Sequence, residues 1–154
     1  FEIIGSGYEK KKIDALQKNL GNRNIEYTGW LPYSHLAAKI AGFDICRGIF
    51  GSSKKADYVV PNKVFHYAAM QKCIISKRTV GIQEVFSQNE NIYLIDNNPH
   101  SLASAINDLK KNWEQRLHLA HNASELIRTE YNERKIAQKL IEILNSFRNE
   151  KDKS

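Results

Sequence analysis

The chain has few of the residues that mark metal-binding and disulfide-bonded proteins. Its 154 residues include only two cysteines, Cys46 and Cys73, and each lies in an apolar run. There is no C-x-x-C pair and no cluster of cysteine with histidine, which argues against zinc. His118 and His121 lie three residues apart, but no carboxylate completes a site beside them. We therefore expect no metal, and two buried, reduced thiols typical of a cytoplasmic protein.

Long apolar runs are also missing. No stretch approaches the ~20 apolar residues that cross a membrane, and no signal peptide is recognisable. The composition, with 42% hydrophobic and 26% charged residues, is that of an ordinary soluble globular protein. The chain begins on Phe1, inside a strand-like run without a preceding Met, so we expect a fragment of a longer protein. We expect one domain over residues 1–148 and a frayed tail over residues 149–154.

Acidic residues are scarce in one segment. The chain has 23 Lys and Arg against 17 Asp and Glu, a net charge of +6. Residues 47–78 contain a single acid, Asp57, and carry the whole excess. The basic residues of this segment are Arg47, Lys54, Lys55, Lys63, Lys72, Lys77 and Arg78. A basic, glycine-containing loop that leads into a helix N-terminus is suited to binding an anion.

The same segment has the pattern of a βαβ unit. An apolar strand at 43–49 is followed by a loop rich in Gly, Ser and Lys at 51–57. Pro61 then opens a helix that runs to about residue 72, and a β-branched strand follows at 73–76. Proline suits the first helical turn, where its missing N–H has no intrahelical partner. Such a unit of ~30 residues is the building block of a parallel sheet.

The rest of the chain alternates the same two patterns. Short apolar runs at 1–4, 24–28 and 91–96 indicate strands, while Ser34 and Pro99 are typical of helix starts. Four further helices are indicated by apolar residues three or four apart. Their stripes are Ile13, Leu16 and Leu20; Leu102, Ile106, Leu109 and Trp113; Leu117, Ala120 and Ile127; and Ile136, Leu140, Ile143, Leu144 and Phe147. This alternation predicts an α/β fold, a Rossmann-like parallel sheet flanked by helices.

Ligands of such sheets bind beyond the carboxyl ends of the strands. Four segments follow predicted strands: the Gly-Ser-Gly turn at 5–7, the loop with Trp30, the loop at 51–60 and the turn with Gly81. We therefore expect all four at one edge, where a nucleotide diphosphate would meet lysines and backbone N–H groups. The turn at 5–7 is not a nicotinamide-cofactor motif, because Lys10 stands where the third glycine belongs.

Several blocks in this order resemble a known family. D-I-C-x-G-I-F-G, K-K-A, V-V-P-N-K-V-F-x-Y-A-A and C-I-I-S resemble the C-terminal, donor-binding domain of group 1 glycosyltransferases, retaining enzymes of the GT-B architecture. The resemblance runs from Gly5 to about residue 145. It implies a nucleotide-diphosphate sugar as substrate, no cofactor, and a polysaccharide or glycolipid as acceptor. It also implies an N-terminal acceptor-binding domain that this chain lacks, and work in the cytoplasm with peripheral contact to the inner face of the membrane.

Charge and resemblance together predict the donor-binding residues, while the catalytic residue stays unassigned. The predicted set is Gly5, Gly7, Trp30, Gly51, Lys55, Asn62, Lys63, His66, Gly81 and Glu84. The chain departs from the family pattern at His66 and Tyr58, where these enzymes usually carry glutamates. Gln71 and Cys73 replace the usual Gly and Pro. A neutral imidazole accepts only one hydrogen bond, so we expect a weaker hold on the ribose.

Other functions stay open at this point. One is a GT-B nucleotide-sugar 2-epimerase, and another is a degenerate, non-catalytic nucleotide-binding module. Binding of nucleic acid would suit the pI of 9.3, but no helix carries clustered Arg and no aromatic residues interleave with the lysines. We expect no nucleic-acid partner. We also expect the isolated chain to fold but to transfer no sugar, because catalysis needs both reactants held together.

Overall fold

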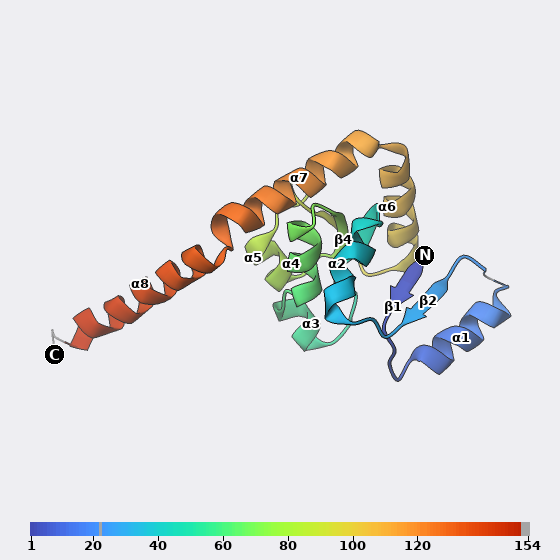
Figure 1. Ribbon diagram of the computed structural model, residues 1–154, viewed down its shortest axis with the longest axis horizontal. Helices are drawn as coiled ribbons and strands as arrows, with labels where there is room; N and C mark the ends of the chain where they lie inside the picture. Colours follow the sequence, from blue (N-terminus) through green and yellow to red (C-terminus); the bar gives the residue numbers. More distant parts are fainter. Residues whose placement is uncertain (22, 152–154) are drawn as a thin grey trace. The chain divides into compact units, whose positions relative to one another are not determined.

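The computed structural model describes residues 1–21 and 23–151, and the side chains of residues 1–21 and 23–148 (Figure 1). The chain divides into two compact units, Phe1–Ile40 and Ala41–Ser154. Both contain parallel strands joined by helices, so the predicted α/β fold is confirmed. The strands form two sheets rather than one, because hydrogen bonds join β1 only to β2. The assignment of residues 1–148 to a single domain stays a prediction.

The first unit contains a separate βαβ unit. Strand β1 (Glu2–Ile4) runs parallel to β2 (Glu26–Gly29), and α1 (Lys10–Asn19) connects them. Helix α2 (Tyr33–Ala41) follows. An ion pair of 2.6 Å joins Lys39 Nζ of α2 to Glu2 Oε1, and the Thr28 hydroxyl donates to the same carboxylate. The hydrogen bond from Lys39, and then that from Thr28, lowers the pKa of Glu2.

The second unit is built on a three-stranded parallel sheet in the order β3-β4-β5. Its strands are β3 (Ile45–Arg47), β4 (Cys73–Lys77) and β5 (Tyr93–Ile95). Its helices are α3 (Lys54–Tyr58), α4 (Asn62–Ala69), α5 (Val80–Val85), α6 (Pro99–Lys111), α7 (Trp113–Glu130) and α8 (Glu133–Lys151). The central strand β4 is buried from its first residue to its fourth. A β-branched, apolar run such as C-I-I-S suits this position between two paired strands.

Two clusters of buried side chains make the core of this unit. Successive side chains of a strand point to opposite faces, so Ile74 and Ile75 of β4 belong to different clusters. The first cluster is Val64, Ala68, Ile74, Ile82, Phe86, Ile92, Leu94 and Ala123. The second is Cys73, Ile75, Ile95, Ala105, Leu109 and Leu119. Burying one such isoleucine stabilises the fold by roughly 1.5–3 kcal/mol, so the helices are held on both faces of the sheet.

Several sequence predictions of local structure need correction. The loop expected at 51–57 contains the short helix α3, which begins because the Ser53 hydroxyl accepts a hydrogen bond from the Ala56 N–H at 3.3 Å. Ser34 lies within α2 and is not its N-cap. Trp113 is not in the stripe of α6, because the Asn112 side chain accepts from the Gln115 N–H and starts α7.

Helix α8 carries the expected apolar stripe, and the stripe is exposed. Its exposed residues are Ile136, Leu140, Ile141, Ile143, Leu144 and Phe147. The helix continues to Lys151, and residues 152–154 lie outside the described residues. Among the helices that the structure describes, none is both long and apolar enough to span a membrane.

Candidate anion-binding site

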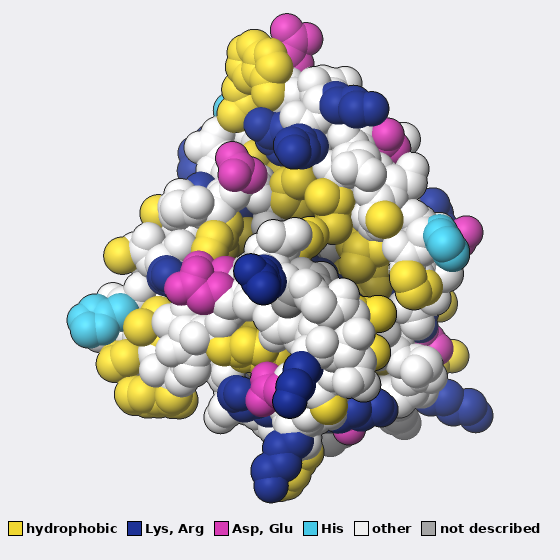
Figure 2. Space-filling model, turned by 90° about the vertical axis from the view of Figure 1, so that its right-hand side faces the viewer, with side chains coloured by type: hydrophobic (Ala, Val, Ile, Leu, Met, Phe, Trp, Pro, Cys, Tyr) yellow, Lys and Arg dark blue, Asp and Glu magenta, His cyan; other side chains and the backbone are white. Residues whose placement is uncertain are grey.

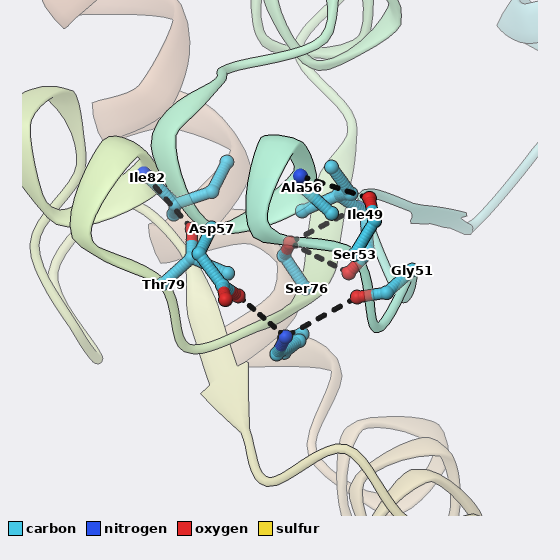
Figure 3. A network of polar contacts seen from close by, with 9 residues as sticks. Ile49, Gly51, Ser53, Ala56, Asp57, Ser76, Thr79 and Ile82 are labelled. Atoms are coloured by element: carbon cyan, nitrogen blue, oxygen red, sulfur yellow. Dashed lines mark hydrogen bonds and ion pairs between the residues drawn. The ribbon is translucent and has the colours of Figure 1, made fainter.

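The loop at 48–59 follows the carboxyl end of β3 and is fixed to the end of β4. Ser76, the fourth residue of β4, is fully buried, and its hydroxyl accepts a hydrogen bond from the Ile49 N–H at 3.1 Å (Figure 3). The Lys77 N–H donates to the Ile49 carbonyl at 3.0 Å. A Cβ atom at Gly48 would lie 2.6 Å from the Ser76 hydroxyl oxygen, so glycine allows this close contact. These contacts therefore fix the backbone conformation of the first residues of the loop.

The ammonium group of Lys77 fixes the middle of the loop. It lies 2.6 Å from the Asp57 carboxylate and donates to the Gly51 carbonyl at 3.2 Å. The pair is partly protected from water, with 17% of the Lys77 side chain and 41% of the Asp57 side chain exposed. Lys77 thus neutralises the single acid of the basic segment and is itself occupied by protein groups.

Two other cations flank the loop. Arg47 ends β3, and its guanidinium lies 4.4 Å from the centre of the Phe50 ring. Lys63 stands in the first turn of α4 and has an exposed side chain. Packing of protein atoms around its ammonium group, followed by repulsion from Arg47, lowers the pKa of Lys63. Neither cation forms a salt bridge with a described residue. Two like charges close together without a carboxylate favour a bound anion.

The N-terminus of α4 adds to this positive field. Its N-cap, Pro61, offers no side-chain hydrogen bond to the first turn. The Pro61 carbonyl accepts from the Val64 N–H at 2.9 Å. The N–H groups of the first helical turn, at Asn62 and Lys63, therefore have no capping side chain, and the helix dipole places partial positive charge there. Arg47, Lys63 and the start of α4 form a candidate anion-binding site.

The helical period predicts Val64, Ala68 and Met70 on the sheet side of α4. Val64 and Ala68 are fully buried in the first core cluster, whereas Met70, the C-cap of the helix, is only half-buried. Asn62 and Lys63 are exposed, and His66 is half-buried one turn later. Residues three and four apart share a helix face, so Asn62, Lys63 and His66 lie together as expected.

The other predicted residues of this unit have different surroundings. Gly51 is exposed, and its carbonyl accepts the Lys77 hydrogen bond. Lys55 is exposed on α3, and Glu84 is exposed on α5. Gly81 is buried in the first turn of α5, where a Cβ atom would lie 2.7 Å from a backbone carbon of Tyr58. The structure thus gives Gly81 a packing contact between α5 and the end of α3.

Three predicted residues belong to the first unit and are placed within that unit alone. The Gly5 N–H donates to the Gly29 carbonyl at 2.6 Å, and Gly5 has a φ of 109°, which glycine adopts readily. Gly7 is exposed, and its carbonyl accepts from the Lys10 N–H at 3.0 Å. Trp30 has 79% of its surface exposed. Its ring offers a large apolar surface beside β2.

Sequence reasoning missed two residues that the geometry brings forward. Arg47 and Lys77 were counted in the charge of residues 47–78 but were not assigned to the site. The charge of Arg47 lowers the pKa of Lys63, and Lys77 holds the loop that connects the two residues along the chain. The available signal was their position, since each is the last residue of a strand. Among residues 1–21 and 23–148, no group of three or more His, Cys, Asp or Glu side chains is placed to hold a metal ion.

Figure 2 shows one face of the molecule, on which basic side chains lie among other residue types. Lys and Arg side chains are separated there by acidic, apolar and uncharged side chains. The candidate site of Arg47, Lys63 and the start of α4 is a local arrangement of two cations and one helix terminus, which suits a small anion.

The lowered pKa of Lys63 predicts a pH-dependent affinity. A lysine whose pKa in the folded chain lies below the ordinary 10.5 loses its charge at a lower pH. Affinity for inorganic pyrophosphate should therefore fall as pH rises through that lowered pKa. Arg47→Gln removes one cause of the shift and should move the fall to higher pH. Calorimetric titrations between pH 7 and 10.5 measure this, with Lys63→Arg as the control for ionisation of the ligand itself. Identical pH profiles for wild type and Lys63→Arg would contradict the prediction.

Known proteins are similar to this chain in sequence and in fold. The model of the glycosyl transferase-like family matches residues 1–142. HepE from Anabaena, solved in complex with UDP-glucose, is 17% identical with a TM-score of 0.79. Sucrose-phosphate synthase from Thermosynechococcus elongatus is 19% identical with a TM-score of 0.75. The C-terminal domain of LpcC, a glycosyl transferase group 1 family protein from Francisella tularensis, is 19% identical with a TM-score of 0.67.

The matches cover most of this chain and a smaller part of the relatives. The alignments take in 94%, 95% and 80% of the chain for HepE, the synthase and the LpcC domain. They take in 40%, 38% and 63% of those three proteins. The chain thus spans less than half the length of HepE and of the synthase. No curated protein sequence matches it significantly.

Proposed function

The chain belongs to the glycosyl transferase-like family, and from this premise we propose that it binds the nucleotide-diphosphate sugar from which an enzyme transfers a sugar. The observation that carries the proposal is the pair formed by Arg47, at the end of β3, and Lys63, in the first turn of α4. A diphosphate brings two or more negative charges to two cations that otherwise repel each other. Charge-assisted hydrogen bonds from these groups would fix the diphosphate beside the loop at 48–59.

The same contacts support the chemistry of transfer. When the bond between sugar and diphosphate breaks, negative charge builds on the leaving phosphate. Side chains and N–H groups already in position stabilise that charge more in the transition state than in the bound substrate. We propose a retaining transfer that uses no metal, because Arg47 and Lys63 supply the positive charge. The acceptor, a polysaccharide or glycolipid, would be bound by a separate N-terminal domain at the cytoplasmic face of a membrane.

The nucleotide can be identified by a panel of ligands. The Anabaena relative was solved with UDP-glucose, so UDP-linked sugars are the first candidates, followed by GDP- and dTDP-linked sugars. A ligand that binds the folded chain but not the unfolded chain stabilises the fold, by about 2.7 kcal/mol at a ligand concentration of one hundred times Kd. The melting temperature rises as a result. We expect one nucleotide family to produce this shift, both as free diphosphate and as sugar conjugate. No shift with any of the nucleotides would contradict the proposal.

His66 provides a prediction about affinity. It lies one turn beyond Lys63 on the same helix, where relatives by resemblance carry a glutamate that accepts hydrogen bonds from the ribose. His66→Glu should therefore tighten nucleotide binding by roughly 1 kcal/mol, the value of one net hydrogen bond. Calorimetry with UDP measures the change, and inorganic pyrophosphate, which has no ribose, is the control ligand. An equal change for both ligands would show that His66 does not contact the ribose.

A further inference from the structure

The Lys77 side chain differs from the other basic residues of its segment. It is the last residue of β4, and only 17% of its side chain is exposed. Its ammonium group contacts two points of the loop, the Gly51 carbonyl and the Asp57 carboxylate. A lysine with this little exposure contributes through its fixed partners rather than as a mobile surface charge.

Neighbours of Lys77 fix both ends of the same loop. Before it, the Ser76 hydroxyl holds Ile49 at the start of the loop. After it, Gly81 packs against the backbone of Tyr58 and Val59, where a Cβ atom would come within 2.9 Å of three backbone atoms. The Thr79 hydroxyl accepts from the Ile82 N–H at 3.2 Å and starts α5 in the position that this packing needs. The segment 76–81 therefore contacts the loop at its beginning, middle and end.

This arrangement matters because the loop separates Arg47 from Lys63. Strand β3 and helix α4 hold these two residues on the sheet, and a loop already fixed between them needs no ordering when an anion binds. Lys77 has a second effect, on the Asp57 carboxylate. Without a paired cation, the negative charge of Asp57 in the loop would repel an anionic ligand. We propose that Lys77 is a positioning residue: it holds the loop at 48–59 so that Arg47 and Lys63 act together, and it neutralises Asp57. This inference rests on the proposed function, because it concerns the same site.

Three variants separate these roles, with UDP as the ligand and the purified chain as the protein. Lys77→Met should raise the Kd for UDP about tenfold. It should also speed amide hydrogen exchange over residues 49–58. Lys77→Arg should stay close to wild type, because it keeps the charge. Lys77→Met with Asp57→Asn should recover part of the lost affinity, since the unpaired carboxylate is gone. The matched control is Lys72→Met, because Lys72 donates to the Ala41 carbonyl, outside the loop.

Each possible result of these measurements either supports or contradicts the positioning role of Lys77. Equal losses of affinity in Lys77→Met and Lys72→Met, or unchanged exchange over 49–58 in Lys77→Met, would overturn it. Failure of Asp57→Asn to recover any affinity would overturn the neutralising role. If Lys77→Met does not fold, Asp57→Asn alone breaks the same ion pair and should still speed exchange. If no nucleotide binds the wild type, both the proposed function and the positioning role of Lys77 fail. If the wild type binds UDP and Lys77→Met binds it equally well, only the positioning role fails.

Discussion

Alanine at Gly81 should destabilise the fold by about 3 kcal/mol, the upper range for a forced steric contact in a packed interior. The added Cβ atom would lie 2.7 Å from the Tyr58 carbonyl carbon and 2.8 Å from the Val59 nitrogen. Both are backbone atoms, which cannot turn aside as a flexible side chain can. Helix propensity alone favours alanine over glycine by about 1 kcal/mol. A net loss would therefore show that the contact between α5 and residues 58–59 outweighs propensity.

Urea unfolding measures this effect, and a second glycine provides the control. Gly7 has no heavy atom within 4 Å of its ideal Cβ position, and its φ is not positive. Gly7→Ala should therefore leave the unfolding midpoint close to that of the wild type. Gly81→Ala should also weaken UDP binding in any protein that stays folded, because residues 58–59 end the loop beside the site. Equal midpoints for the two variants would contradict the packing role of Gly81.

Loss of both flanking cations should reduce the affinity for a nucleotide diphosphate about one hundredfold or more. Hydrogen bonds to charged groups contribute roughly 1.5–3 kcal/mol each, and 1.4 kcal/mol corresponds to a factor of ten. Arg47→Gln with Lys63→Met removes two such donors. Lys63→Ala alone should cost ~1–2 kcal/mol. Calorimetric titration with UDP measures both values.

The loss of binding should not come from unfolding. Loss of water around the ammonium group, followed by repulsion from Arg47, lowers the pKa of Lys63, which means that folding disfavours its charged form. Between the folded and unfolded pKa values the unfolded chain holds more protons, so stability rises with pH in that window. At neutral pH, Lys63→Met removes an unfavourable charge and should leave the melting temperature equal or higher. The control Lys10→Met with Lys12→Gln removes the same charge from α1. Equal losses of affinity for UDP in the two double variants would indicate diffuse electrostatic attraction rather than a binding site.

The sequence predicted most of the fold because its signals are local. The β-branched run C-I-I-S and Pro61 locate β4 and the start of α4. The helical period places Val64 and Ala68 in the core, as observed. The fold expected by resemblance, one half of a GT-B glycosyltransferase, is confirmed by the family match and the structural relatives. Trp113 was misplaced because apolar spacing continues across Asn112, which is the C-cap of α6 and whose side chain caps the start of α7.

The site was predicted less completely because its geometry depends on distant residues. Lys77 and Asp57 are twenty positions apart, and no local pattern pairs them. The sequence therefore treats Lys77 as one of several equivalent basic residues. Gly81 was expected to let backbone groups approach an anion, whereas its close contact to residues 58–59 appears only when α3 and α5 are placed together. Arg47 was counted as a charge, but a strand end does not reveal which helix lies beside it.

The location of the bound nucleotide is the central claim, and amide hydrogen exchange with and without UDP tests it most directly. We expect UDP to slow exchange at the end of β3, in the loop at 48–59 and in the first turn of α4. The end of α6 and all of α7 should be unchanged. The Arg47→Gln and Lys63→Met double variant should lose the protection under the same conditions. Protection confined to other segments, or retained in full by the double variant, would contradict the assignment of the site.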